Sequence, residues 1–82
     1  MIDTSVLVLN RSYQPIHVTN VRRAFTLLYL GVAHAVDRQF RALDFASWSQ
    51  LSAEAGDEVI RTVDRVILVP RVIMLQLYDR IP

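Results

Sequence analysis

Short apolar runs separated by turn residues follow one another along the 82-residue chain, and this pattern predicts a small α+β domain. The run Ser5–Leu9 is rich in β-branched residues and stops at an asparagine, which is typical of a buried strand. Asn10–Pro15 is then expected to turn, because Asn, Ser and Pro each favour a bend. Ile16–Val18 is expected to form a second extended segment.

The clearest helical signal covers Val21–Leu30, which consists largely of good helix formers. Either Thr19 or Asn20 can cap its start, and Gly31 stands where a left-handed residue ends a helix. Apolar residues occupy most of its circumference and leave only a narrow polar stripe. We therefore expect this helix to be largely enclosed.

The middle of the chain predicts a strand, a loop and a second helix. Val32–Asp37 is expected to return as a strand, and Arg38–Asp44 to be a polar connection with one or two buried aromatic residues. Ser47 and Gln50 have the spacing of a capping box, so a short helix is predicted over Trp48–Ala55, ending at the following glycine. The sequence shows no internal repeat.

The last third of the chain favours strand over Glu58–Val69, and Pro70 must interrupt any ladder there. Residues 71–78 fit a helix or a buried strand equally well, because periodicity cannot separate the two over eight residues. The prediction is one domain covering residues 1–82. A small mixed or antiparallel sheet packs against one main helix, and a second, short helix is present.

Composition narrows the class of protein. Apolar residues make up 52% of the chain, slightly above the usual ~45–50%, yet no run approaches the ~20 residues of a membrane span. The apolar excess indicates either a well-filled core or a face that docks on a partner. Cysteine is absent, which excludes disulfides and thiolate zinc sites and fits a cytoplasmic protein without a membrane partner.

His17, Asn20 and His34 occur in the order of a nuclease His-Asn-His site, but their context argues against one. No acidic neighbour directly precedes His17, and a whole apolar helix separates Asn20 from His34. A metal site needs three or more converging ligands with outer-shell partners. No Ser-His-Asp arrangement or glycine-rich phosphate loop is present either. We therefore predict no catalytic and no metal-binding residues in this chain.

Arginine supplies all nine basic residues, either because it binds phosphate bidentately or because a GC-rich genome favours its codons. Arg22 and Arg23 fall in the first turn of the predicted helix, where exposed N–H groups and the macrodipole favour an anion. With Arg11 in the preceding turn, they are the candidate contacts to DNA phosphate. The alternative is an internal ion pair with Asp3, with Asp37 or with a carboxylate elsewhere in the chain.

Aromatic residues offer a second kind of nucleic-acid contact. Trp48 and the tyrosines can stack on bases, although packing in a core or an interface is the more usual role of such residues. The net charge of +1 does not by itself indicate nucleic-acid binding.

Several segments match one pattern, and the matching stretches are Val6–Asn10, Tyr13–Thr19, Val21–Ala33, Val69–Leu75 and Tyr78–Pro82. Together they resemble the N-terminal region of a family of bacterial HNH endonucleases. This chain differs from the pattern at Val32, where the family has lysine, and Arg38–Asp57 has no counterpart in it.

The resemblance implies that the chain is a non-catalytic accessory domain, which positions or dimerises a nuclease and contacts the DNA backbone. The Cys-x-x-Cys pairs, the His-Asn-His residues and the divalent metal would belong to a nuclease module that follows it. The whole protein would then hydrolyse phosphodiesters with a His-activated water. A second hypothesis is a free-standing interaction module that forms a homodimer and has no nucleic-acid role.

Overall fold

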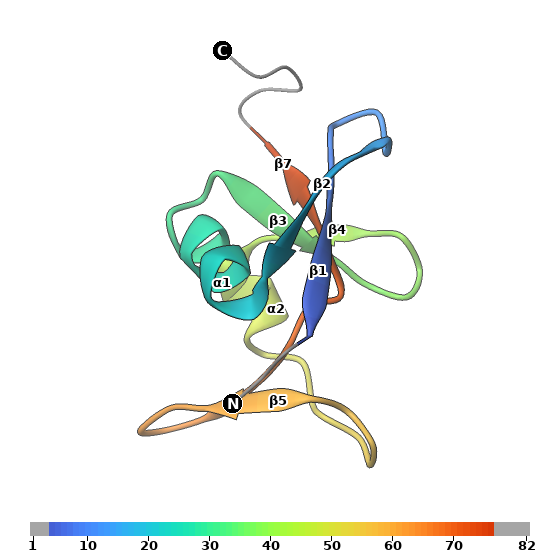
Figure 1. Ribbon diagram of the computed structural model, residues 1–82. Coiled ribbons are helices and arrows are strands. Elements are labelled where there is room, and N and C mark those ends of the chain that lie inside the picture. The colour runs from blue at the N-terminus through green and yellow to red at the C-terminus, as the bar shows by residue number, and fades with distance from the viewer. Residues whose placement is uncertain (1–3, 77–82) are drawn as a thin grey trace.

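The computed structural model describes residues 4–76, and it confirms the α+β class. Seven strands and two helices follow one another along the described residues (Figure 1). They are β1 (Ser5–Leu9), β2 (Pro15–Asn20), α1 (Val21–Tyr29), β3 (Ala33–Val36), β4 (Ala42–Leu43), α2 (Phe45–Trp48), β5 (Val59–Arg61), β6 (Val66–Leu68) and β7 (Val72–Leu75).

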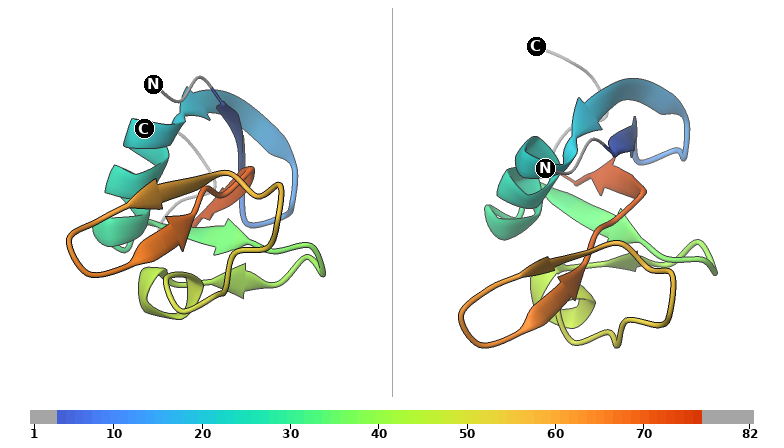
Figure 2. Two further views of the ribbon diagram at one scale, coloured as in Figure 1. Left: turned by 90° about the horizontal axis from the view of Figure 1, so that it is seen from below. Right: turned by 60° about the horizontal axis from the view of Figure 1, so that its bottom comes forward.

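Five strands form a mixed sheet in the order β2-β1-β7-β3-β4. The last strand, β7, lies in the centre, parallel to β1 and antiparallel to β3, while the pairs β1–β2 and β3–β4 are antiparallel. A separate hairpin of β5 and β6 lies at one end of the domain (Figure 1, Figure 2). The sheet is therefore mixed rather than wholly antiparallel.

One face of the sheet forms the core with α1. Cross-strand partners share a face, so Val8, Ile73 and Ala35 stand in one row, and each of them is buried. The buried residues of α1 pack against this face and are Val21, Ala24 and Leu28. The hairpin closes the core with Ile67.

The predicted main helix is confirmed, with its termini set as the sequence indicates. The Oδ1 atom of Asn20 accepts the N–H of Arg23 at 2.8 Å, which makes Asn20 the N-cap. At the other end, the N–H groups of Gly31 and Val32 return to the carbonyls of Leu28 and Leu27, and Gly31 has φ +81°. This is the Schellman arrangement, for which glycine is suited.

The prediction that this helix is largely enclosed is wrong. Tyr29 is 75% exposed and Leu30 is 66% exposed. The sheet covers the helix on one side only, so three of its nine residues are buried.

The second helix differs from the prediction. It spans Phe45–Trp48 rather than Trp48–Ala55, and Asp44, not Ser47, caps it by accepting the Ser47 N–H at 2.8 Å. A charged carboxylate is the stronger acceptor at this position, and the Trp48 indole is held by a 2.8 Å bond to the Leu68 carbonyl. Gly56, with φ +89°, lies in a turn instead of ending a helix.

The strand predicted over Glu58–Val69 is confirmed as two strands, β5 and β6. Pro70 separates the hairpin from β7, as expected. The open choice between helix and strand is resolved as strand for Val72–Leu75, and positions 77 and 78 lie outside the described residues. No helix in residues 4–76 is long and apolar enough to cross a membrane.

Candidate nucleic-acid interface

His17 and His34 lie on opposite faces of the sheet. His17 pairs with Val8, whereas His34 pairs with Met74, and Val8 and Met74 belong to alternate rows. Strands β1 and β7 also stand between them. Within residues 4–76, no three His, Cys, Asp or Glu side chains lie close enough to hold a metal ion.

Arg22 and Arg23 are both exposed in the first turn of α1. Asp37, one of the carboxylates considered as their partner, binds Arg41 instead, at 2.8 Å. Asp3, a second candidate partner, lies outside the described residues. The ion pairs found in the described part of the chain are Arg38–Asp57, Arg41–Asp37 and Arg65–Asp64.

Arg11 does not join Arg22 and Arg23 in one corner. It lies in the turn that precedes β2, whereas the two other arginines follow the end of this strand. Six residues of strand span roughly 17–20 Å, so one phosphate group cannot contact both ends. The three candidate residues can contact one nucleic acid only at separate phosphates.

Arg11 instead belongs to a five-residue hairpin loop, Asn10–Gln14, which joins β1 to β2 and which we call the first loop. The Oδ1 atom of Asn10 accepts two backbone N–H groups, from Ser12 at 2.8 Å and from Gln14 at 3.0 Å. The backbone of Asn10 also exchanges hydrogen bonds with Tyr13 and Gln14. One buried side chain thus organises the whole loop.

A second loop, Asp37–Arg41, joins β3 to β4 and repeats this geometry. The Oδ1 atom of Asp37 accepts the N–H groups of Gln39 and Arg41, both at 2.9 Å. The Phe40 N–H donates to the Asp37 carbonyl, and the Asp37 N–H donates to the Arg41 carbonyl. We call these two segments the twin loops.

Each twin loop holds an aromatic residue in the left-handed region at its fourth position. Tyr13 and Phe40 both have φ +63°. The Tyr13 hydroxyl donates to the Phe40 carbonyl at 2.8 Å, so the two loops meet although they are 27 residues apart. The first loop lies at the upper right of the view and the second loop lies below it on the right (Figure 1). Phe40, a residue expected to be buried, is 74% exposed because it lies at a loop tip.

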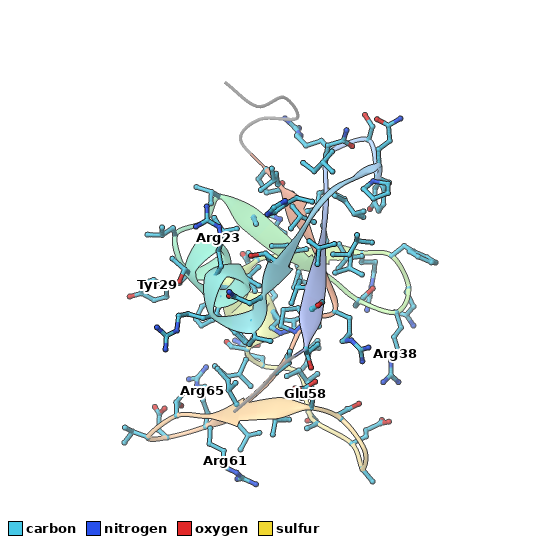
Figure 3. All side chains as sticks on the ribbon, in the orientation of Figure 1. Arg23, Tyr29, Arg38, Glu58, Arg61 and Arg65 are labelled. Atoms are coloured by element: carbon cyan, nitrogen blue, oxygen red, sulfur yellow. The ribbon has the colours of Figure 1, made fainter. Side chains whose placement is uncertain are left out.

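Charges around the twin loops are arranged with the cations outward. The Arg38 side chain is 85% exposed while its partner Asp57 is 18% exposed, and Arg41 is 65% exposed against 11% for Asp37. Figure 3 shows Arg38 projecting from the domain. The backbone N–H of Arg41 is the main cause that lowers the pKa of Asp37, and the Arg41 guanidinium acts in the same direction.

An open cleft of about 830 Å³ adjoins the second loop. Arg38 and Phe40 line it from the loop, and Arg71 lines it from the segment before β7. Carboxylates from the segment between α2 and β5 also line it, and these are Glu54, Asp57 and Glu58. The cleft therefore combines charged side chains with an apolar part of its lining, to which Phe40, Leu51 and Val72 belong.

The likeness of the twin loops was not predicted from the sequence. Their residues are Asn-Arg-Ser-Tyr-Gln and Asp-Arg-Gln-Phe-Arg, which agree in type at positions one, two and four. Both follow a buried apolar strand, and this context is the signal that could have revealed them. Trp48, considered for base stacking, is buried and belongs to the core.

Comparison with known proteins adds the family. Residues 6–82 match the family described as the HNH endonuclease-associated, N-terminal domain. No match to the chain was found among curated proteins or among solved structures. Since the match covers nearly the whole chain, the protein belongs to the family of HNH endonuclease-associated N-terminal domains.

Proposed function

We propose that this domain is a non-catalytic accessory domain that positions or dimerises an HNH nuclease and contacts the backbone of its DNA. The observation that carries the proposal is the family match over residues 6–82. In this proposal the associated nuclease hydrolyses phosphodiesters with the help of a divalent metal. Both parts act in the cytoplasm.

Contact with the DNA backbone is supported by the start of α1. Arg22 and Arg23 are exposed there, and N–H groups of the first turn point toward the same region. Arg11, a strand length away, would contact a different phosphate of the same DNA.

The test is binding of fluorescently labelled duplex DNA to the 82-residue chain across a salt series. We expect the logarithm of the binding constant to fall linearly with the logarithm of salt concentration, because phosphate contacts release counterions. The variant Arg22→Ala/Arg23→Ala should bind more weakly, with a salt slope reduced by about 2.

The matched control is Arg61→Ala. Arg61 is exposed on β5 and projects away from α1 (Figure 3). This variant should bind DNA like the parent chain. Absence of measurable binding at low salt, or equal binding by the double variant, would refute the backbone contact.

A homodimeric interaction module is the second candidate, and one surface favours it. Exposed Tyr29 and Leu30 line an apolar groove of about 370 Å³ together with Phe25, Phe45 and Ile60. Sedimentation over a concentration series tests it. A dimer that Leu30→Glu dissociates, in a chain that binds no DNA, would favour this candidate over the first.

A further inference from the structure

We propose that the twin loops form a site for an unpaired base of a nucleic-acid strand, in which the ring of Phe40 stacks on the base. Arg11 and Arg38 would contact the flanking phosphates. This inference rests on the proposed contact with DNA, and it adds the form of DNA that the domain recognises. The case depends on Phe40, on the charges around it and on the cleft beside it.

Phe40 is unfavourable in two respects for the isolated domain. A bulky residue with φ +63° is an uncommon conformation, for which glycine or asparagine is preferred. Its ring is also 74% exposed to water. Tyr13 has the same backbone conformation, but its hydroxyl forms the bond that joins the loops. The Phe40 ring has no such internal role, so a binding role explains its presence.

The charges beside Phe40 suit a phosphate-bearing ligand. Arg38 and Arg41, its neighbours in the second loop, have exposed side chains above carboxylates that are mostly buried. Arg38 uses one nitrogen, Nη2, on Asp57, which leaves its other N–H donors available. Arg11 adds an exposed cation in the first loop, which the Tyr13 hydroxyl bond holds against the second.

The cleft sets the orientation of the ligand. Glu54, Asp57 and Glu58 line it and would disfavour a phosphate there, whereas the Arg38 side chain, which lines it from the second loop, is 85% exposed. A base can therefore enter beside the Phe40 ring while its phosphates remain at the arginines.

An unpaired base fits this geometry better than an intact duplex does. Bases within a duplex are stacked on one another, so their faces are not accessible to a ring at a loop tip. Stacking on aromatic residues beside a cationic surface is the common mode of single-strand binding. Because Phe40 has no hydrogen-bonding group, we expect little preference for base sequence.

The experiment measures binding of a fluorescein-labelled 12-nucleotide oligothymidine to the 82-residue chain. A second oligonucleotide carries one 2-aminopurine, whose fluorescence falls when the base is stacked. The key variant is Phe40→Asn, because asparagine tolerates the left-handed region and removes the ring. Arg61→Ala is the matched surface control.

We expect Phe40→Asn to lower single-strand affinity on the order of 10-fold and to abolish the 2-aminopurine quenching. Its thermal midpoint should equal or exceed that of the parent chain. Phe40→Trp should retain affinity and quenching. This combination would establish stacking by an exposed ring that is not needed for folding.

Other outcomes overturn the inference. If Phe40→Asn binds the oligonucleotide like the parent chain, or unfolds at a lower temperature, the ring does not have this role. If duplex DNA binds through Arg22 and Arg23 while the oligonucleotide does not bind, the base site fails and the proposed function stands. If neither form of DNA binds, both fail. Loss of nuclease association in Phe40→Asn, with unchanged DNA binding, would show a protein contact instead.

Discussion

The twin loops reach one backbone geometry by two different chemistries. In the first loop a neutral amide at Asn10 accepts the two N–H groups, and in the second loop the carboxylate of Asp37 does so. The fourth residue has φ +63° in both, although neither has glycine there. The acceptor at position one is therefore the feature that determines this turn.

The two loops also differ in the bond between the side chains of their first and fifth residues. In the first loop Asn10 Nδ2 donates to Gln14 Oε1 at 3.1 Å, while in the second loop Arg41 Nε donates to Asp37 Oδ2 at 2.8 Å. Both loops thus bridge their first and last side chains, one with an amide pair and one with an ion pair. The first loop should be insensitive to pH, and the second should not be.

Removal of the acceptor in the first loop should have the largest effect. Asn10→Ala leaves two backbone N–H groups without their partner in a site where Asn10 is 8% exposed. We expect a loss of about 2 kcal/mol in the free energy of unfolding, measured by urea denaturation. Asn10→Asp keeps the acceptor and should lose less at neutral pH. Equal losses in both variants would show that the acceptor does not determine the turn.

Asparagine at position four tests the strain in each loop. Phe40→Asn should raise the free energy of unfolding by up to about 1 kcal/mol, because it relieves a left-handed aromatic residue. Tyr13→Asn should change it by less, since the same relief is offset by loss of the bond to the Phe40 carbonyl. Denaturation of both variants side by side measures the difference. A larger gain from Tyr13→Asn would contradict the assignment of roles.

The smallest expected effect is a change in stability at acidic pH. Hydrogen bonds lower the pKa of Asp37, so its folded value lies below its unfolded value near 4, and its stabilising contribution is present above that pH. The contribution is lost as the pH falls through the folded pKa. Asp37→Asn should therefore be less stable than the parent chain at pH 6 and converge with it toward pH 3. The pKa of Asp44 is lowered as well, and Asp44 contributes the same pH dependence of stability to the parent chain and to the variant.

Urea denaturation at a series of pH values measures the pH dependence of stability of the parent chain and of Asp37→Asn. The variant Asn10→Asp tests the opposite change in the first loop. That substitution places a carboxylate in the first loop and should introduce a pH dependence where there was none. Parallel stability profiles for the parent chain and Asp37→Asn would contradict the prediction.

The sequence predicts an element correctly where residues within that element determine its structure. The helix α1 and its ends were predictable because Asn20 and Gly31 act within a few residues. The second helix was not, because competing acceptors at Asp44 and Ser47 lie three residues apart. The identity of β7 as a strand depends on pairing with distant β1 and β3, which no window of eight residues contains.

The candidate site was predictable only in part. The positions of Arg22 and Arg23 in the first turn of α1 were predicted correctly. Residues that are consecutive in sequence lie close together in a helix, so the helix prediction alone determines these positions. Arg11 was grouped with them because it is near in sequence, but an extended strand carries it far away. The contact between Tyr13 and Phe40 arises from tertiary structure and has no local signal.

The central place of β7 has a consequence for synthesis of the protein. On the ribosome, β1 and β3 emerge long before the strand that must stand between them. Until residues 72–75 leave the exit tunnel, the edges of two separate hairpins remain open to wrong pairing or aggregation. The sheet can then close only by insertion of its middle strand, a step that brings together residues more than 60 positions apart. Folding of this domain is thus timed by the translation of its last described strand.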